Sequence, residues 1–243
     1  MVVDAKRIAE LNELTLDTNG LTIGAAVPCR TLWEDERIRQ HYPALIDSVE
    51  LIGGVAIQGR ATLGGNLCNA APSADGIPTL IALGAVAHLA SATGTRQVPV
   101  EQICVAPGKT CLAADELLVK LHVPAPVPHA GARFLRFIPR NEMDIAVVNV
   151  ATAVTLDAKG EKFLVARIAV GSVAPTPLFV PAAGAALVGQ PVNEASIAAA
   201  AQIAMDAAKR IGDMRGTVRQ RKHLVKVLVA RALRGAIERA KGV

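Results

Sequence analysis

The feature that most constrains this chain is the stretch RATLGGNLCNAAPSAD at residues 60–75. Its adjacent glycines, Gly64 and Gly65, remove two Cβ atoms where an extended apolar segment stops, so another molecule can approach the backbone and its N–H groups can point at an anion. Thr62 and Asn66 add hydroxyl and amide groups that exchange hydrogen bonds. The stretch is typical of a site for a nucleotide diphosphate that carries a polyol. A tight turn without a ligand is the alternative.

Asp75 closes this stretch with a carboxylate that can accept hydrogen bonds from two hydroxyls. Residues 77–83 then predict a short helix that Gly84 ends. A carboxylate before a first turn that contains proline is also a common N-cap. Ligand binding and helix capping therefore both remain open for Asp75, and one side chain can do both.

The glycine stretch is the first of five ordered blocks that resemble the FAD-binding (medium) subunit of molybdenum hydroxylases, the xanthine dehydrogenase and carbon monoxide dehydrogenase type. The blocks are T-L-G-G-N-L-C-N-A-x-P-x-A-D with I-G-G and Arg60 before it, D-E-L-L at 115–118, D-I-A at 144–146, G-S-V-A-P-T-P at 171–177 and R-G at 215–216. A pair of glycines alone would be weak support, whereas five blocks at family-like spacing are specific.

The resemblance implies FAD as the cofactor of this chain, with no catalytic side chain and no metal ligand on it. Carried over residue by residue, it implies cofactor contacts at Thr62, Gly64, Gly65, Asn66 and Asp75, of which the glycines and the asparagine line the pyrophosphate. It also implies contacts at Ile52 and Gly53 near the flavin side and at Leu118 and Arg136 at the far edge of the cofactor. For Leu118, an ordinary place in the hydrophobic core is the alternative and the favoured one.

The resemblance also implies partners. In a heterotrimer of this family, substrate is oxidised at a molybdopterin centre on a large subunit, electrons cross 2Fe–2S clusters on a small subunit, and the FAD subunit passes them to NAD, oxygen or another acceptor. This chain would then be an electron-transferring oxidoreductase subunit. The alternatives are a non-catalytic assembly module of the same complex that has lost FAD binding, and a free-standing flavin oxidoreductase.

The family pattern begins with a βαβ lobe whose own glycine motif, A-G-G-T or similar, holds the other side of the FAD pyrophosphate. Residues 3–11, VDAKRIAEL, resemble the close of that lobe. Each charge-assisted hydrogen bond lost costs about 1.5–3 kcal/mol. We therefore expect this chain alone to bind FAD weakly or not at all, unless a separate polypeptide supplies the lobe.

The composition excludes several other classes of protein. With 51% apolar and 19% charged residues in 243, the chain is globular. No apolar run approaches the roughly 18 residues of a membrane span, and the charged N-terminus is no secretory signal, so we expect a cytoplasmic protein. The four cysteines form no C-x-x-C pair, which argues against a zinc or iron–sulfur site and favours buried reduced thiols.

The basic segment from residue 218 onward predicts a long terminal helix with one apolar face. Nucleic-acid or membrane binding is conceivable for such a helix. Packing on the preceding helix explains the apolar face, however, and aromatic residues for base stacking are absent from it. We favour a structural helix whose basic surface faces another subunit.

These signals predict an α+β fold in two domains. Residues 1–128 are expected to form an FAD-binding lobe of the PCMH type with a mixed sheet and helices, and residues 129–243 a small three-stranded antiparallel sheet with helices, with the linker PAPVPHAG at 124–131 between them. The expected strands are 21–27, 55–57, 86–90, 96–100, 117–123, 134–138, 145–156 and 163–172. The expected helices start at a Thr31–Glu34 capping box and at Pro43, and cover 77–83, 180–188, 197–211 and 218–240.

Overall fold

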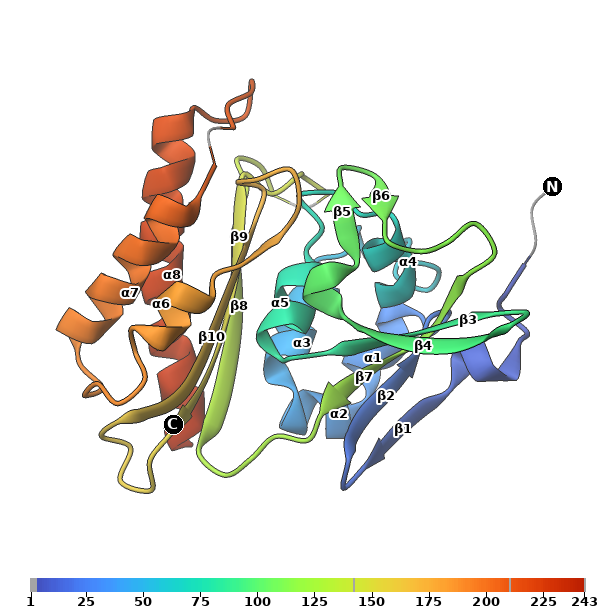
Figure 1. Ribbon diagram of the computed structural model, residues 1–243, viewed down its shortest axis with the longest axis horizontal. Helices are drawn as coiled ribbons and strands as arrows, with labels where there is room; N and C mark the ends of the chain where they lie inside the picture. The colour runs from blue at the N-terminus through green and yellow to red at the C-terminus, as the bar shows by residue number, and fades with distance from the viewer. Residues whose placement is uncertain (1–3, 142, 210, 243) are drawn as a thin grey trace.

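Two antiparallel sheets, with helices between and outside them, make up the protein in a computed structural model that describes residues 4–141, 143–209 and 211–242 (Figure 1). The α+β class is confirmed. Each sheet has its own hydrophobic core. The boundary predicted after residue 128 falls in the connection between the two sheets and stays a prediction.

The first sheet has five strands in the order β1-β2-β7-β3-β4. They are β1 (Leu14–Asp17), β2 (Gly20–Gly24), β7 (Leu117–Pro124), β3 (Val86–Ser91) and β4 (Gly94–Pro99). All its ladders are antiparallel, so the expectation of a mixed sheet was wrong. The reason is topological: β2 and β3 run in the same direction, but β7 lies between them and pairs antiparallel with both.

Short helices connect β2 to β3. They are α1 (Cys29–Glu34), α2 (Glu36–His41), α3 (Pro43–Val49), α4 (Leu63–Cys68) and α5 (Gly76–Ala82), with the 3₁₀ turns η1 (Ala9–Asn12) and η2 (Val100–Gln102) and the small hairpin of β5 (Cys104–Ala106) and β6 (Lys109–Thr110) elsewhere in this part of the chain. Pro43 occupies the first turn of α3 as predicted.

Two local predictions in this region were wrong. The Thr31–Glu34 capping box does not exist, because α1 already begins at Cys29; the capping carboxylate is Asp35, which accepts from the amides of α2. The strand expected at 55–57 is a series of turns in which the Ile57 amide donates to the Gly54 carbonyl. Among the described residues, no strand pairs with this segment to satisfy an extended backbone.

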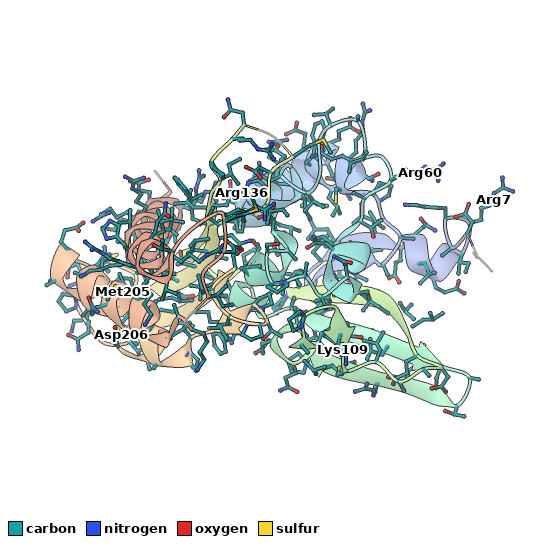
Figure 2. All side chains as sticks on the ribbon, turned by 90° about the horizontal axis from the view of Figure 1, so that it is seen from above. Arg7, Arg60, Lys109, Arg136, Met205 and Asp206 are labelled. Atoms are coloured by element: carbon teal, nitrogen blue, oxygen red, sulfur yellow. The ribbon has the colours of Figure 1, made fainter. Side chains whose placement is uncertain are left out.

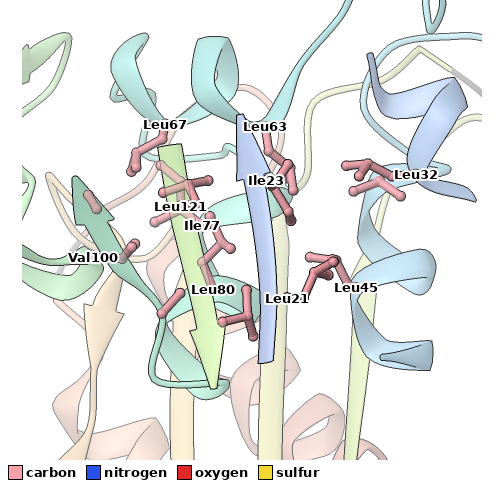
Figure 3. Packing of buried hydrophobic residues seen from close by; sticks show 14 of the residues in the cluster. Leu21, Ile23, Leu32, Leu45, Leu63, Leu67, Ile77, Leu80, Val100 and Leu121 are labelled. Atoms are coloured by element: carbon pink, nitrogen blue, oxygen red, sulfur yellow. The ribbon is translucent and has the colours of Figure 1, made fainter. Parts of the chain in front are cut away.

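The first core forms where these helices cover one face of the sheet. Leu21 and Ile23 of β2 are fully buried, and Figure 3 shows their side chains gathered with those of Leu45, Leu80 and Leu121. Burying side chains of this size stabilises the fold by about 1.5–3 kcal/mol each. The first sheet therefore holds α3 and α5 firmly against itself.

The second sheet has the order β11-β10-β9-β8. Its strands are β8 (Ala130–Phe137), β9 (Val148–Leu156), β10 (Phe163–Gly171) and β11 (Leu178–Phe179), and its helices are α6 (Pro181–Ala185), α7 (Glu194–Ala207) and α8 (Val218–Lys241). Three strands were predicted; β11 is a fourth, and two residues after a proline are too short to give a strand pattern. Helix α7 ends at Ala207, four residues before the predicted end at residue 211.

Helices α7 and α8 cover the outer face of the second sheet, whereas α3 and α5 lie between the two sheets (Figure 1). Helix α3 packs against β8, and α5 packs against β9 and β10. Val225, Val229 and Leu233 of α8 are fully buried, as expected of a structural helix. Within the described ranges, no helix combines the length and apolar character needed to cross a membrane.

Arg221, near the N-terminus of α8, ties the start of this helix to the second sheet. Arg221 is only 4% exposed. Its Nη1 donates to the carbonyls of Val147 (2.6 Å) and Ser172 (2.8 Å), and its Nη2 donates to the Asp213 carboxylate (2.7 Å). The Arg221 side chain thus provides hydrogen-bond donors for the carbonyl just before β9 and for the carbonyl just after β10.

We predict that Arg221→Leu lowers the free energy of unfolding by about 2–5 kcal/mol, because each buried carbonyl left without a donor costs about 1–3 kcal/mol. Urea unfolding monitored by circular dichroism measures this change. The control is Arg219→Leu, an exposed arginine in the same turn of α8, which should change stability by no more than about 0.5 kcal/mol. Equal effects of the two substitutions would contradict the structural role of Arg221.

Candidate functional site

The glycine stretch forms the N-terminus of α4, a helix of six residues. Thr62 is its N-cap: its Oγ1 accepts from the Gly65 amide (2.8 Å), and its carbonyl accepts from the Asn66 amide (2.9 Å). The Gly64 amide has no acceptor in the described part of the chain, whereas the Leu63 amide faces the Val27 carbonyl in the isolated antiparallel bridge between Pro28 and Thr62. These N–H groups lie at the positive end of the helix dipole, which favours an anion there.

The two glycines serve different purposes. A Cβ on Gly64 would lie 2.5 Å from the Ala25 carbonyl oxygen, so this residue is glycine because α4 packs directly on the backbone of Ala25. A Cβ on Gly65 would meet only the Thr62 hydroxyl, at 3.1 Å, and Gly65 is exposed. The expectation that both glycines leave the backbone open to another molecule is therefore met by Gly65 and not by Gly64.

Asn66 links α4 to the next helix. Its Oδ1 accepts from the amide of Gly76, the first residue of α5 (3.1 Å). This leaves the Nδ2 group of Asn66 as the donor that a ligand could use. The predicted residues of α4 are thus brought together on one short helix, and Asn66 fixes that helix relative to Asp75 and α5.

Asp75 is 8% exposed and makes an ion pair with the second sheet. Its Oδ2 accepts from Arg136 Nη1 (2.5 Å), and its Oδ1 accepts from Asn149 Nδ2 (3.0 Å). It makes no capping hydrogen bond to α5, so the interpretation as a helix cap was wrong: its oxygens are engaged by β8 and β9 instead. Burial raises the pKa of Asp75, and Arg136 and Asn149 oppose that rise. A direct contact with the cofactor stays a prediction.

Arg136 of β8 contacts two segments of the first half of the chain, and we call this meeting point of the two sheets the junction. Besides Asp75, its Nη1 donates to the carbonyl of Leu51 (3.2 Å), the residue before the predicted flavin-side residues Ile52 and Gly53. Figure 2 places Arg136 near the middle of the molecule, where the second sheet meets the helices of the first. Ile52 is 9% exposed, and Gly53 has a φ of +69°, which glycine adopts without strain.

Leu118 lies apart from these groups. It is 7% exposed, belongs to the first core and pairs with Leu89 across β7 and β3. These contacts support the core interpretation, and its predicted place at the edge of the cofactor stays a prediction. The structure therefore brings together the α4 residues, and it connects Asp75, Arg136 and the loop at Ile52 and Gly53 through shared hydrogen bonds.

Two residues that sequence reasoning missed complete the junction. Asn149 is fully buried, and its Nδ2 also donates to the carbonyl of Ala74 (3.2 Å). Ser172, at a φ of +64°, donates its amide to the Pro72 carbonyl (2.7 Å), so the G-S-V-A-P-T-P block sits on the segment that ends at Asp75. A single amide side chain in the apolar run AVVNVATAV was the available signal for Asn149.

The cysteines are free thiols in different environments. Cys29 is buried, and burial raises its pKa to about 12. Cys68, the last residue of α4, is exposed, so the expectation of buried thiols was wrong for it. In the ranges covered by the structure, no three His, Cys, Asp or Glu side chains lie close enough together to hold a metal ion.

Comparison with known proteins identifies the family. Residues 1–126 match the family model of the FAD binding domain in molybdopterin dehydrogenase, and residues 133–236 match that of the CO dehydrogenase flavoprotein C-terminal domain. The chain belongs to the FAD-binding subunits of the xanthine and CO dehydrogenase family. This FAD subunit is a component of an oxidoreductase, and FAD is its cofactor.

Relatives and solved structures agree with the assignment of this FAD subunit. It is 33% identical to the xanthine dehydrogenase FAD-binding subunit of Escherichia coli O157:H7, over 99% of this chain and 82% of the relative. It is 30% identical to subunit alpha of the 6-hydroxypseudooxynicotine dehydrogenase complex of Paenarthrobacter nicotinovorans, over 99% and 81%. Its fold matches the carbon monoxide dehydrogenase of Hydrogenophaga pseudoflava with a TM-score of 0.91 and 28% identity, over 96% of this chain and 80% of that one.

We predict that Arg136→Met lowers the free energy of unfolding at pH 7 by about 3–5 kcal/mol, because it leaves the buried Asp75 carboxylate without its countercharge. The pKa of Asp75 should rise further in this variant. A carboxyl group whose pKa is higher in the folded than in the unfolded chain binds more protons when folded, so its contribution to stability improves as the pH falls. The deficit of Arg136→Met should therefore shrink between pH 7 and pH values near the ordinary 3.8 of aspartate.

Urea unfolding at several pH values tests this prediction. The double variant Arg136→Met with Asp75→Asn has no carboxyl group at the junction and should lack the pH-dependent recovery. Arg37→Met removes an ion pair with Asp35 whose arginine is 63% exposed, and it should cost at most about 1 kcal/mol. An Arg136→Met protein as stable as the wild type at pH 7 would show that the pair does not hold the two sheets together.

Proposed function

We propose that this FAD subunit carries electrons within a molybdopterin-dependent dehydrogenase: it accepts them from 2Fe–2S clusters on a small partner subunit and delivers them to NAD, oxygen or another acceptor, while a large partner subunit holds the molybdopterin. The family assignment supports this proposal. The observation that carries it in this chain is the α4 N-terminus, where the exposed Gly65 lies beside the Gly64 amide, which has no acceptor among the described residues.

The residues of α4 fit one side of a diphosphate. The Gly64 amide would donate to its oxygens, the Thr62 hydroxyl and Asn66 Nδ2 would add polar contacts, and Gly65 leaves space for close approach. Bound FAD would supply the redox chemistry. The role of this chain is then to bind and orient the cofactor, with Ile52 and Gly53 on the flavin side.

The isolated chain should have low affinity for FAD. The α4 N-terminus offers one backbone amide without an acceptor, that of Gly64, whereas Asp75 and Arg136 already satisfy each other. A diphosphate needs donors around several oxygens, and each missing charge-assisted hydrogen bond costs about 1.5–3 kcal/mol. Contacts from outside residues 4–242 would therefore be needed for tight binding. The cytoplasmic location is a further part of this proposal.

The paired glycines provide a direct test of the site. We expect Gly65→Ala to weaken FAD binding at least about tenfold, or about 1.4 kcal/mol, because the methyl group would fill the open space, and to leave the fold intact. Gly64→Ala should instead destabilise the protein, because its methyl group would overlap the Ala25 backbone. Titration of flavin fluorescence and thermal unfolding measure the two effects.

Cys68→Ala, an exposed change at the other end of α4, is the control and should alter neither quantity. Wild-type affinity in Gly65→Ala would place the diphosphate elsewhere. A wild-type melting temperature for Gly64→Ala would contradict the packing of α4 on Ala25.

The electron-transfer role is tested by purifying the chain from its native cells under conditions that preserve complexes. The proposal predicts stoichiometric molybdenum and iron by elemental analysis, bound FAD in the visible spectrum, and reduction of that flavin when the complex receives its substrate. Molybdenum and iron without FAD would instead support the assembly module. FAD without either metal would support the free-standing flavin oxidoreductase.

A further inference from the structure

One face of α8 gathers cations over the edge strand of the second sheet. Arg231, Arg234, Glu238 and Arg239 recur at the spacing of a single helical face. Together with Arg133 of β8 they line a concavity of about 480 Å³ between α8 and β8. None of these residues belongs to the candidate cofactor site, and the family assignment does not account for them.

The arginines of this concavity are not fully neutralised. Arg239 is held by Asp47 through two hydrogen bonds (2.7 and 2.9 Å), whereas Arg133 reaches the same carboxylate only at 3.3 Å. Arg231 makes no hydrogen bond or ion pair with any other described residue, and Glu238 takes part in none of the ion pairs. The concavity is thus lined by four guanidinium groups and one carboxylate, that of Glu238. Asp47 and Glu194 pair with three of the arginines but do not belong to the lining.

Arg234 can change partners easily. Its guanidinium is paired with Glu194 through Nε and Nη2 (2.9 and 2.6 Å), but the two side chains are 45% and 70% exposed. An exposed ion pair contributes little net stability, so an anion that enters the concavity can replace Glu194 at small cost. Arg231 and Arg234 are therefore the two cations available to a ligand, and Arg239 is the fixed one.

The shape of the concavity suits a small anion. A Cβ on Gly235 would lie 3.1 Å from Arg133 Cγ, so this glycine gives the arginine stem room to cross α8. Leu135 forms an apolar part of the lining. Guanidinium groups bind planar or tetrahedral oxyanions through paired N–H donors, which makes several arginines around one hollow a typical phosphate or polycarboxylate site.

We propose that this concavity is a binding site for a small oxyanion of at least two negative charges, such as a phosphate ester or a polycarboxylate. Arg231 and Arg234 contact the ligand, and Arg239 together with Asp47 fixes the wall on which it rests. The site lies on the second sheet, so it does not depend on the proposed position of FAD.

Isothermal titration of the full chain with pyrophosphate, at constant ionic strength, tests this proposal. The expected result is saturable binding at one site, weakened at least tenfold in Arg231→Gln and in Arg234→Gln. Arg37→Gln, an exposed arginine on α2, should bind as the wild type does. Thr62→Ala and an excess of FAD should also leave the binding unchanged, which distinguishes this site from the α4 N-terminus.

Three outcomes would overturn the proposal. They are the absence of saturable binding, equal loss of binding in Arg37→Gln, and displacement of pyrophosphate by FAD. The second would indicate general charge attraction, and the third would assign the pyrophosphate to the cofactor site. Thermal unfolding of each variant without ligand shows whether a loss of binding reflects a loss of fold.

Discussion

The buried ion pair between Asp75 and Arg136 joins the two sheets of this protein. Both side chains are at most 10% exposed, and the same arginine also holds the Leu51 carbonyl. Asn149 adds donors to Asp75 and to the backbone just before it. A charged group so deep in the protein requires its partner, because an isolated buried charge is very costly. The second sheet thereby fixes the loop at Ile52 and the end of the glycine stretch.

Much of the fold could be predicted from the sequence because its long strands and helices have regular patterns. The strands at 86–90, 96–100 and 117–123 and the helices after Pro43 and Gly76 lie where hydrophobic periodicity and the flanking turn residues indicate. The pattern could not show that β7 lies between β2 and β3, because strand order depends on long-range contacts. It also missed β11, which is only two residues long.

The candidate site was predicted in part, and the limits have physical causes. A sequence shows that Gly64 and Gly65 lack a Cβ. It does not show that the Ala25 backbone fills the space beside Gly64, whereas no backbone fills the space beside Gly65. Asp75 carries the local signals of a helix cap, yet Arg136 and Asn149, distant in sequence, engage its carboxylate. The family resemblance names the residues as a group, and that assignment stays a prediction, whereas the contacts of each residue are visible only in the structure.

The central place of β7 in the first sheet has a consequence for folding during synthesis on the ribosome. The hairpin of β1 and β2 and the hairpin of β3 and β4 can each close early, but they have no direct ladder between them. Only when residues 117–124 emerge can β7 join the two hairpins, and until then both carry an open edge. Strand β7 therefore completes the first sheet. We expect nascent chains that stall before residue 117 to aggregate and to bind chaperones more than longer ones, because their strand edges are unpaired.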